Sequence, residues 1–210
     1  LGRLVGVFIF ATNLNILYLQ STAMTELVLI GTMTAGVYYL LCWAQDKKVT
    51  NLIATGFFIF LSTLVRYDGW FLLAMATVII GIVAWRNFGK KSTEGIIIFF
   101  LTLSSFGVIL WFLWNALIFK DPLYFAFGPY SARAQQEQLQ QAGVLATKGN
   151  LWLSLKIYWY ALVYNSYALS VFLGLAGAIV LWLDKKISAN FKIVTSALFA
   201  PLLFNVLALY

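Results

Sequence analysis

The sequence predicts an all-α protein, a polytopic transmembrane helical bundle of about seven spans that forms one transmembrane domain over residues 1–210. Hydrophobic residues make up 62% of the chain and charged residues only 10%, whereas soluble domains carry about 25% charged residues. The apolar residues fall in runs close to the roughly 20 residues that a helix needs to cross a bilayer. The chain begins without Met and ends inside an apolar run, so we expect an internal fragment of a longer protein.

Four spans are expected in the first half of the chain, at about residues 4–17, 24–45, 51–65 and 69–85. A polar connection over residues 13–26 follows the first span, and irregular backbone at membrane depth must be buried in protein or line a cavity. The third and fourth spans are joined by a charged turn that contains Arg66 and Asp68.

Three further spans are expected in the second half, at about residues 95–119, 153–183 and 193–210. An outer loop at about 120–150 begins with Lys120-Asp121-Pro122, where Pro122 disfavours further helix. The loop contains a short surface helix capped by Ser131. The span at 153–183 is too long for a perpendicular crossing, so it either tilts or begins as a helix on the surface. Pro201 is expected to kink the last helix.

Lys and Arg are distributed unevenly between the two sides that these spans create. One side receives Arg3, Lys47, Lys48, Arg86, Lys90, Lys91, Lys185, Lys186 and Lys192, and the other receives Arg66, Lys120, Arg133, Lys148 and Lys156. The richer side is cytoplasmic by the positive-inside rule. The net charge of +7 is therefore assigned to membrane orientation and to anionic lipid, not to nucleic acid. The expected location is a prokaryotic plasma membrane, although composition also allows the endoplasmic reticulum.

The residue types available for chemistry are few. The chain has no His and a single Cys, Cys42, inside an apolar run, so the commonest general base and a thiolate metal site are both missing. Acid, base or metal chemistry must come from the seven Asp and Glu residues.

The outer side gathers most polar residues that are suited to chemistry. Its charged members are Glu26, Arg66, Asp68, Lys120, Asp121, Arg133 and Glu137, and its aromatic members are Tyr18, Tyr67, Trp70, Tyr124, Phe125 and Tyr130. Cations suit a phosphate, and carboxylates suit a divalent metal or an acceptor hydroxyl. This combination fits a phosphorylated lipid that carries a polar head.

Structural explanations remain open beside the functional ones. Arg66 and Asp68 could simply end their helices and pair at the interface, and Tyr67 and Trp70 fit an ordinary aromatic belt. A functional role is favoured for Glu26, because an ionisable group at the start of a span is costly in lipid without a partner or a task.

Four stretches, 13–26, 63–70, 121–125 and 128–132, resemble the middle of the multi-spanning GT-C glycosyltransferases. The likeness is to the branch similar to protein O-mannosyltransferases and aminoarabinose transferases. The resemblance implies an enzyme that takes a sugar from a polyprenyl-phosphate carrier on the outer leaflet and transfers it, with inversion, to a protein or lipid acceptor.

The resemblance also implies roles for particular residues. The main catalytic acid of the family would precede Leu1, so Glu26 is a secondary acid and a candidate ligand for a divalent cation, Mg or Mn. Arg66 is expected to contact phosphate, and Asp68 to hold Arg66 or take part in catalysis. The further substrate-binding candidates are Gln20, Tyr67, Trp70, Lys120, Tyr124, Tyr130 and Arg133.

Two other classes of protein compete with the enzyme. A transporter or flippase for a lipid-linked or anionic substrate would use the same cations and aromatics without bond cleavage, and a membrane scaffold would need neither. Transport predicts charged residues at mid-membrane, whereas the charges here gather at the ends of the spans. That distribution favours the enzyme.

Overall fold

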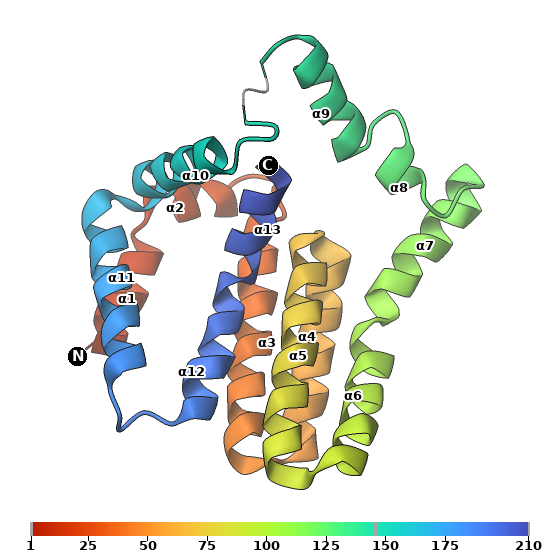
Figure 1. The fold of residues 1–210 in the computed structure, drawn as a ribbon. Helices are drawn as coiled ribbons and strands as arrows, with labels where there is room; N and C mark the ends of the chain where they lie inside the picture. Colours follow the sequence, from red (N-terminus) through yellow and green to blue (C-terminus); the bar gives the residue numbers. More distant parts are fainter. Residues whose placement is uncertain (1, 145–146, 210) are drawn as a thin grey trace.

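The computed structural model describes residues 2–144 and 147–209, and this part of the chain is helical and contains no strand (Figure 1). The helices are α1 (Gly2–Ala11), α2 (Leu14–Gln20), α3 (Glu26–Asp46), α4 (Val49–Val65), α5 (Asp68–Phe88), α6 (Lys90–Ser104), α7 (Phe106–Phe119), α8 (Tyr124–Phe127), α9 (Ala132–Gln141), α10 (Leu151–Ser166), α11 (Ala168–Leu183), α12 (Ala189–Thr195) and α13 (Ala200–Leu209), with a 3-10 turn η1 (Ser196–Phe199) before α13.

Four helical segments in the described residues are long and apolar enough to cross a membrane: α3, α5, the pair α6–α7 and the segment Ala189–Leu207. The pair α10–α11 adds a fifth if it counts as one span, but it is bent by 109°. α4 is apolar and only 17 residues long. The all-helical fold is confirmed, and the candidate spans number four or five where the sequence predicts about seven.

The first predicted span is interrupted, which accounts for part of that difference. α1 ends at Ala11, and α2 begins after Asn13, whose side chain accepts hydrogen bonds from the backbone N–H groups of Asn15 and Ile16. An Asn that satisfies these free N–H groups starts a new helix. The connection expected to be irregular is therefore helical over Leu14–Gln20.

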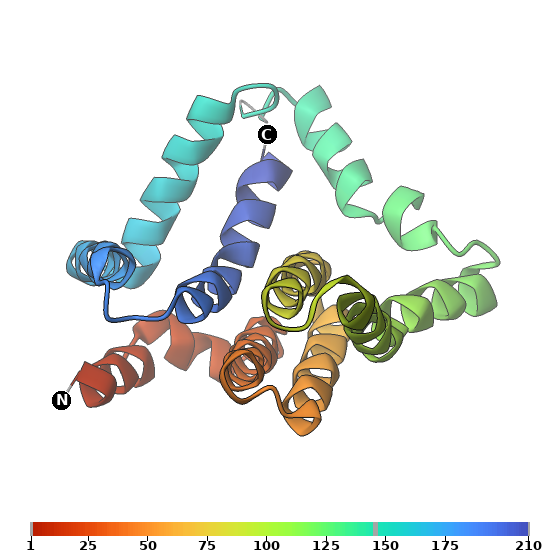
Figure 2. The same cartoon turned by 60° about the horizontal axis from the view of Figure 1, so that its bottom comes forward.

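The core lies where α3, α4 and α5 pack together, with α6 and α12 against them. Its largest fully buried side chains include Trp43, Phe100 and Leu40. Figure 2 shows the same bundle with α1 and α11 on one side of it and α7 to α9 on the other. Many apolar side chains of α7 and α11 are exposed, as expected of surfaces that meet lipid.

The two ends of the bundle differ in charge. The turns between α3 and α4, α5 and α6, and α11 and α12 lie at the lower end in Figure 1, which we call the basic end; they contain Lys47, Lys48, Lys90, Lys91, Lys185 and Lys186. The start of α3, the α4–α5 turn and helices α8 to α10 lie at the upper end, called here the turn end. This grouping agrees with the alternation of spans expected from the sequence.

The second half of the chain supports two expectations and leaves a third, at Pro201, as a prediction. Ser131 caps α9, since its hydroxyl accepts a hydrogen bond from the Ala134 N–H. The long sixth segment bends at Tyr167, so α10 crosses the turn end and α11 runs along the bundle (Figure 1). The helix from Ala189 to Leu209 changes to the 3-10 turn η1 just before Pro201, which is where a proline disturbs helical hydrogen bonding. A kink at Pro201 stays a prediction.

Candidate functional site

Arg66 connects the first residues of two helices at the turn end. Its Nη1 pairs with Oε1 of Glu26, the first residue of α3, and its Nε donates to Oδ2 of Asp68, the first residue of α5, at 3.2 Å. Carboxylates are stabilised at helix N-termini, where the backbone N–H groups give a partial positive charge. α4 ends at Val65, and Arg66, the next residue, has an extended backbone.

Asn205 of α13 completes the surroundings of Asp68. Its Nδ2 donates to Asp68 Oδ1 at 3.0 Å and to the Pro201 carbonyl at 2.7 Å. The Asp68 side chain is only 5% exposed, and a buried carboxylate is tolerated when its oxygens are paired. Both of its oxygens have donors, so α13 is tied to the α4–α5 turn through this residue. We call Glu26, Arg66, Asp68 and Asn205 the charged cluster.

Tyr158 of α10 lies beside the charged cluster. Its phenol lies within reach of the negative charge of Asp68. α10 also packs against α13. The helix that crosses the turn end therefore borders the cluster.

Glu26 retains one acceptor atom with no partner in the described part of the chain. Its Oε2 is shielded from solvent, yet no described group donates to it. An unpaired buried acceptor costs about 1–3 kcal/mol, so a ligand that donates a hydrogen bond here is favoured.

Replacing Arg66 by Ala is expected to lower the free energy of unfolding by about 2–3 kcal/mol. Losing one partner of a fully buried ion pair costs roughly 3–5 kcal/mol, and the value here is smaller because the Arg66 side chain is 38% exposed. Asp68 would keep only its Asn205 hydrogen bond. SDS titration of the full-length protein in mixed micelles measures the change.

The matched control for that measurement is Arg133→Ala. Arg133 pairs with Glu137 four residues along α9, and both side chains are more than half exposed, so its loss should cost less than about 1 kcal/mol. Equal effects of the two substitutions would contradict a stabilising role for the charged cluster.

An aromatic cluster lies next to the charged one and includes Tyr67, the residue between Arg66 and Asp68. Tyr67 stacks on Phe125 of α8, with ring centroids 5.7 Å apart, and Trp70 meets the same ring edge-on at 5.6 Å. Trp111 and Phe112 of α7 also contact Phe125. Burial raises the pKa of the Tyr67 phenol above its ordinary value. These contacts bring the segment after α7 to the charged turn.

The last turn of α4 is held by two tryptophans. The indole N–H groups of Trp70 and Trp111 both donate to the Thr63 carbonyl, each at 3.1 Å. Carbonyls in the last turn of a helix lack helical partners, so this oxygen can accept both. Trp70 thus has a structural task besides the substrate contact predicted from the sequence.

A cavity of about 220 Å³, called here the aromatic cavity, opens between α7 and α8. Its lining includes three tyrosines that the sequence marks as candidates, and the lining residues are Tyr67, Trp111, Trp114, Asn115, Phe119, Tyr124, Phe125, Tyr130 and Ser131. Tyr124 stacks on Phe119, with centroids 4.1 Å apart. The structure therefore gathers Tyr67, Tyr124 and Tyr130 around one space.

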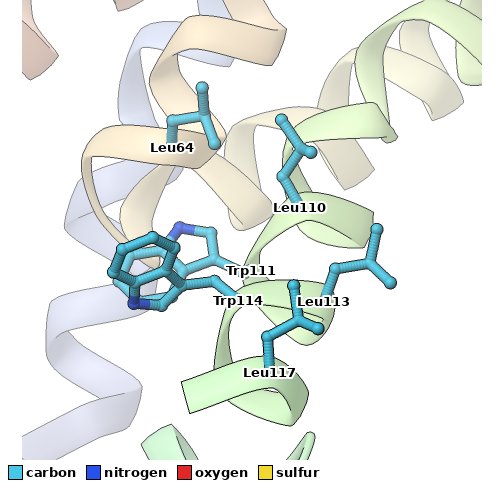
Figure 3. Close-up of a pocket in the computed structure, with 6 residues that line it drawn as sticks. All are labelled: Leu64, Leu110, Trp111, Leu113, Trp114 and Leu117. Carbon is cyan, nitrogen blue, oxygen red and sulfur yellow. The ribbon is translucent and has the colours of Figure 1, made fainter.

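An apolar groove of about 590 Å³ adjoins this cavity on the outside of α4 and α7. Figure 3 shows the six side chains that line it, Leu64, Leu110, Trp111, Leu113, Trp114 and Leu117. We call it the leucine groove. Trp111 and Trp114 line both spaces, so a ligand could have its apolar part in the groove and its polar part in the aromatic cavity.

Three predicted substrate residues make no described contact with the charged cluster. Lys120 is exposed at the end of α7 with a left-handed backbone, φ 60°. Arg133 is held by Glu137 and lies over the Phe127 ring. Gln20 is the exposed last residue of α2. Their roles stay predictions.

A metal site at Glu26 also stays a prediction. Within residues 2–144 and 147–209 no three His, Cys, Asp or Glu residues are grouped so that they could hold an ion. The Arg66 guanidinium already pairs with one Glu26 oxygen, and a second cation on the same carboxylate would be repelled by it.

Sequence reasoning missed Asn205, Asn115 and Trp111. Asn205 is a polar residue inside the apolar run 202–209, and polar residues within spans usually have partners or tasks. That signal could have marked Asn205 and the buried Asn115. Nothing in the sequence separates Trp111 from the other tryptophans.

The fold and the site define an all-helical protein whose several long apolar helices fit a membrane protein, with a charged cluster and an aromatic cavity at one end. In comparisons with known proteins, no family model, no curated protein and no solved structure matches the chain.

Proposed function

We propose that the protein is an integral-membrane glycosyltransferase of the GT-C type with about seven spans. It moves a hexose or pentose from a polyprenyl-phosphate donor to a protein or lipid acceptor on the extracytoplasmic side of a prokaryotic plasma membrane. The resemblance of the four sequence stretches supports this family. The observation that carries the proposal is the wall that Trp111 and Trp114 share between the leucine groove and the aromatic cavity.

The two adjoining spaces suit the two halves of such a donor. The leucine groove is lined by Leu and Trp side chains alone, so it offers an isoprenoid tail surroundings as apolar as the bilayer. The aromatic cavity offers Tyr67 and Tyr124 beside Asn115, and such mixed surfaces orient polar ligands. The sugar would lie beside Tyr67, the chain neighbour of Arg66 and Asp68.

The charged cluster supplies the acid-base and charge roles in this proposal. The acceptor hydroxyl donates to Glu26 Oε2, which takes its proton as the oxygen attacks the anomeric carbon. The bond from that carbon to the phosphate oxygen breaks, and polyprenyl phosphate leaves. Arg66 orients Glu26 and has further N–H donors for the phosphate, while Asp68 and Asn205 hold Arg66. A divalent cation, Mg or Mn, could also stabilise the leaving phosphate.

Reconstitution distinguishes this enzyme from a flippase. The full-length protein is placed in liposomes with a radiolabelled C55-polyprenyl-phosphate hexose and a membrane extract that supplies acceptors. The expected result is label in an acceptor and free polyprenyl phosphate in stoichiometric amounts. Donor that crosses the bilayer uncleaved would instead identify a flippase, and would contradict the proposal.

The orientation has its own test in intact cells. In a Cys42→Ser background, Gln138→Cys places a thiol on the exposed face of α9 at the turn end, and Lys91→Cys places one at the basic end. An impermeant maleimide is expected to label position 138 in intact cells and position 91 only after permeabilisation. The reverse pattern would overturn the extracytoplasmic site.

A further inference from the structure

A second groove, at the other end of the molecule, has no place in the proposed reaction. It follows α5 and closes against α6, encloses about 510 Å³, and is lined by Thr77, Val78, Gly81, Ile82, Trp85, Arg86 and Ile97. The positions on α5 recur at helical spacing, so they form one stripe that runs toward the basic end. Val78 and Trp85 are 61% and 64% exposed.

The groove changes character along its length. Its inner part is apolar and includes Gly81, which has no side chain of its own; a Cβ there would lie 3.4 Å from Ile97 Cδ1. Its outer part consists of the Trp85 ring and the Arg86 guanidinium. Trp is favoured at the headgroup level of a bilayer because its ring is apolar and its N–H is polar.

Arg86 differs from the other arginines whose side chains are described. Arg66 and Arg133 each pair with carboxylates, whereas in the described residues the Arg86 guanidinium makes no hydrogen bond and no ion pair. Lys90 and Lys91 follow directly after the turn at Gly89, and Glu94 is the one acid in the first turns of α6. The outer part of the groove, at Trp85 and Arg86, therefore has an excess of positive charge around it.

We propose that this groove binds one anionic membrane phospholipid. An acyl chain lies along Val78, Gly81 and Ile82, the glycerol backbone meets Trp85, and the phosphate accepts hydrogen bonds from Arg86. Arg presents N–H groups in a fork that fits phosphate oxygens, and basic pockets between spans select acidic lipid heads. Lys90 and Lys91 add positive charge, which favours a headgroup with a net negative charge over a zwitterionic one.

Native mass spectrometry of the full-length protein tests the site. The protein is exchanged into detergent with equal amounts of phosphatidylglycerol and phosphatidylcholine, and retained lipid adducts are counted. The wild type is expected to retain phosphatidylglycerol in preference. Arg86→Ala should lower the ratio of the two adducts about fivefold, while Lys148→Ala, just before α10 at the turn end, should leave it unchanged.

A substitution that fills the groove tests the proposed position of the acyl chain separately from the phosphate contact at Arg86. Gly81→Phe places a ring where the acyl chain is proposed to lie, and it should lower both adducts together without changing their ratio. An unchanged phosphatidylglycerol preference in Arg86→Ala, or undiminished adducts in Gly81→Phe, would overturn the proposal. Because Arg86 is an exposed residue, its substitution tests the site even if Gly81→Phe reduces the yield of folded protein.

Discussion

We expect Glu26→Gln to lower the rate of the proposed sugar transfer by about 10²–10⁴-fold, the usual contribution of a positioned general base. The amide keeps the size of the carboxylate and a carbonyl oxygen that can accept from Arg66, but it cannot take the acceptor proton. The expected change is therefore in kcat, with a much smaller change in KM for the donor. Initial rates in reconstituted liposomes, at several donor concentrations, measure both.

The control for this substitution is Glu137→Gln. Glu137 is exposed and pairs with Arg133 on α9, away from the charged cluster, so transfer should continue at the wild-type rate. A Glu26→Gln protein that transfers sugar normally would remove Glu26 from the reaction. It would leave the enzyme class open, since another acid could serve as the base.

Gly69→Ala is expected to lower the free energy of unfolding by about 3 kcal/mol, at the upper part of the range for overpacking. The second residue of α5 passes directly against the last turn of α4. A Cβ at Gly69 would overlap the Ser62 carbonyl and lie 2.7 Å from the Thr63 nitrogen. These are backbone atoms and cannot rotate away, so α5 must shift and the Arg66–Asp68 pair with it.

Gly31→Ala provides the comparison. Gly31 lies within α3 and is exposed. A Cβ added there would meet no atom within 4 Å beyond the backbone of its own helix. Ala there is expected to leave the protein as stable or up to about 1 kcal/mol more stable, because Ala is the better helix former. SDS titration of both variants measures the difference, and equal stabilities would mean that α4 and α5 do not approach as described.

Hydropathy and turn residues were sufficient to predict the central helices. α3 and α5 begin and end within three residues of the predicted bounds. A long apolar run bounded by charges must satisfy its backbone hydrogen bonds internally in lipid, and a single such run does so as a helix. The Ser131 cap was also predictable from local sequence. The break at Asn13 was not, since the same polar residues can cap a helix or interrupt one.

The candidate site was predictable only in part. Glu26, Arg66 and Asp68 stood out because charges at a membrane boundary need partners, and the structure brings these three into contact. Asn205 lies 137 residues from Asp68, and no local pattern reports such a pairing. The positions of Lys120 and Arg133 depend on how the loop after α7 folds, which composition does not determine.

The Thr63 carbonyl has a wider consequence, because a single backbone oxygen fastens α7 and α5 to the same point. Trp111, one of its two donors, is also part of the leucine groove. A ligand in that groove would contact Trp111. Through the Thr63 carbonyl, this contact is connected to the turn that contains Arg66. For the proposed polyprenyl-phosphate donor, the length of the tail would then affect the position of the Arg66 turn. Donor analogues with short tails are expected to be poor substrates even when the sugar and phosphate are intact.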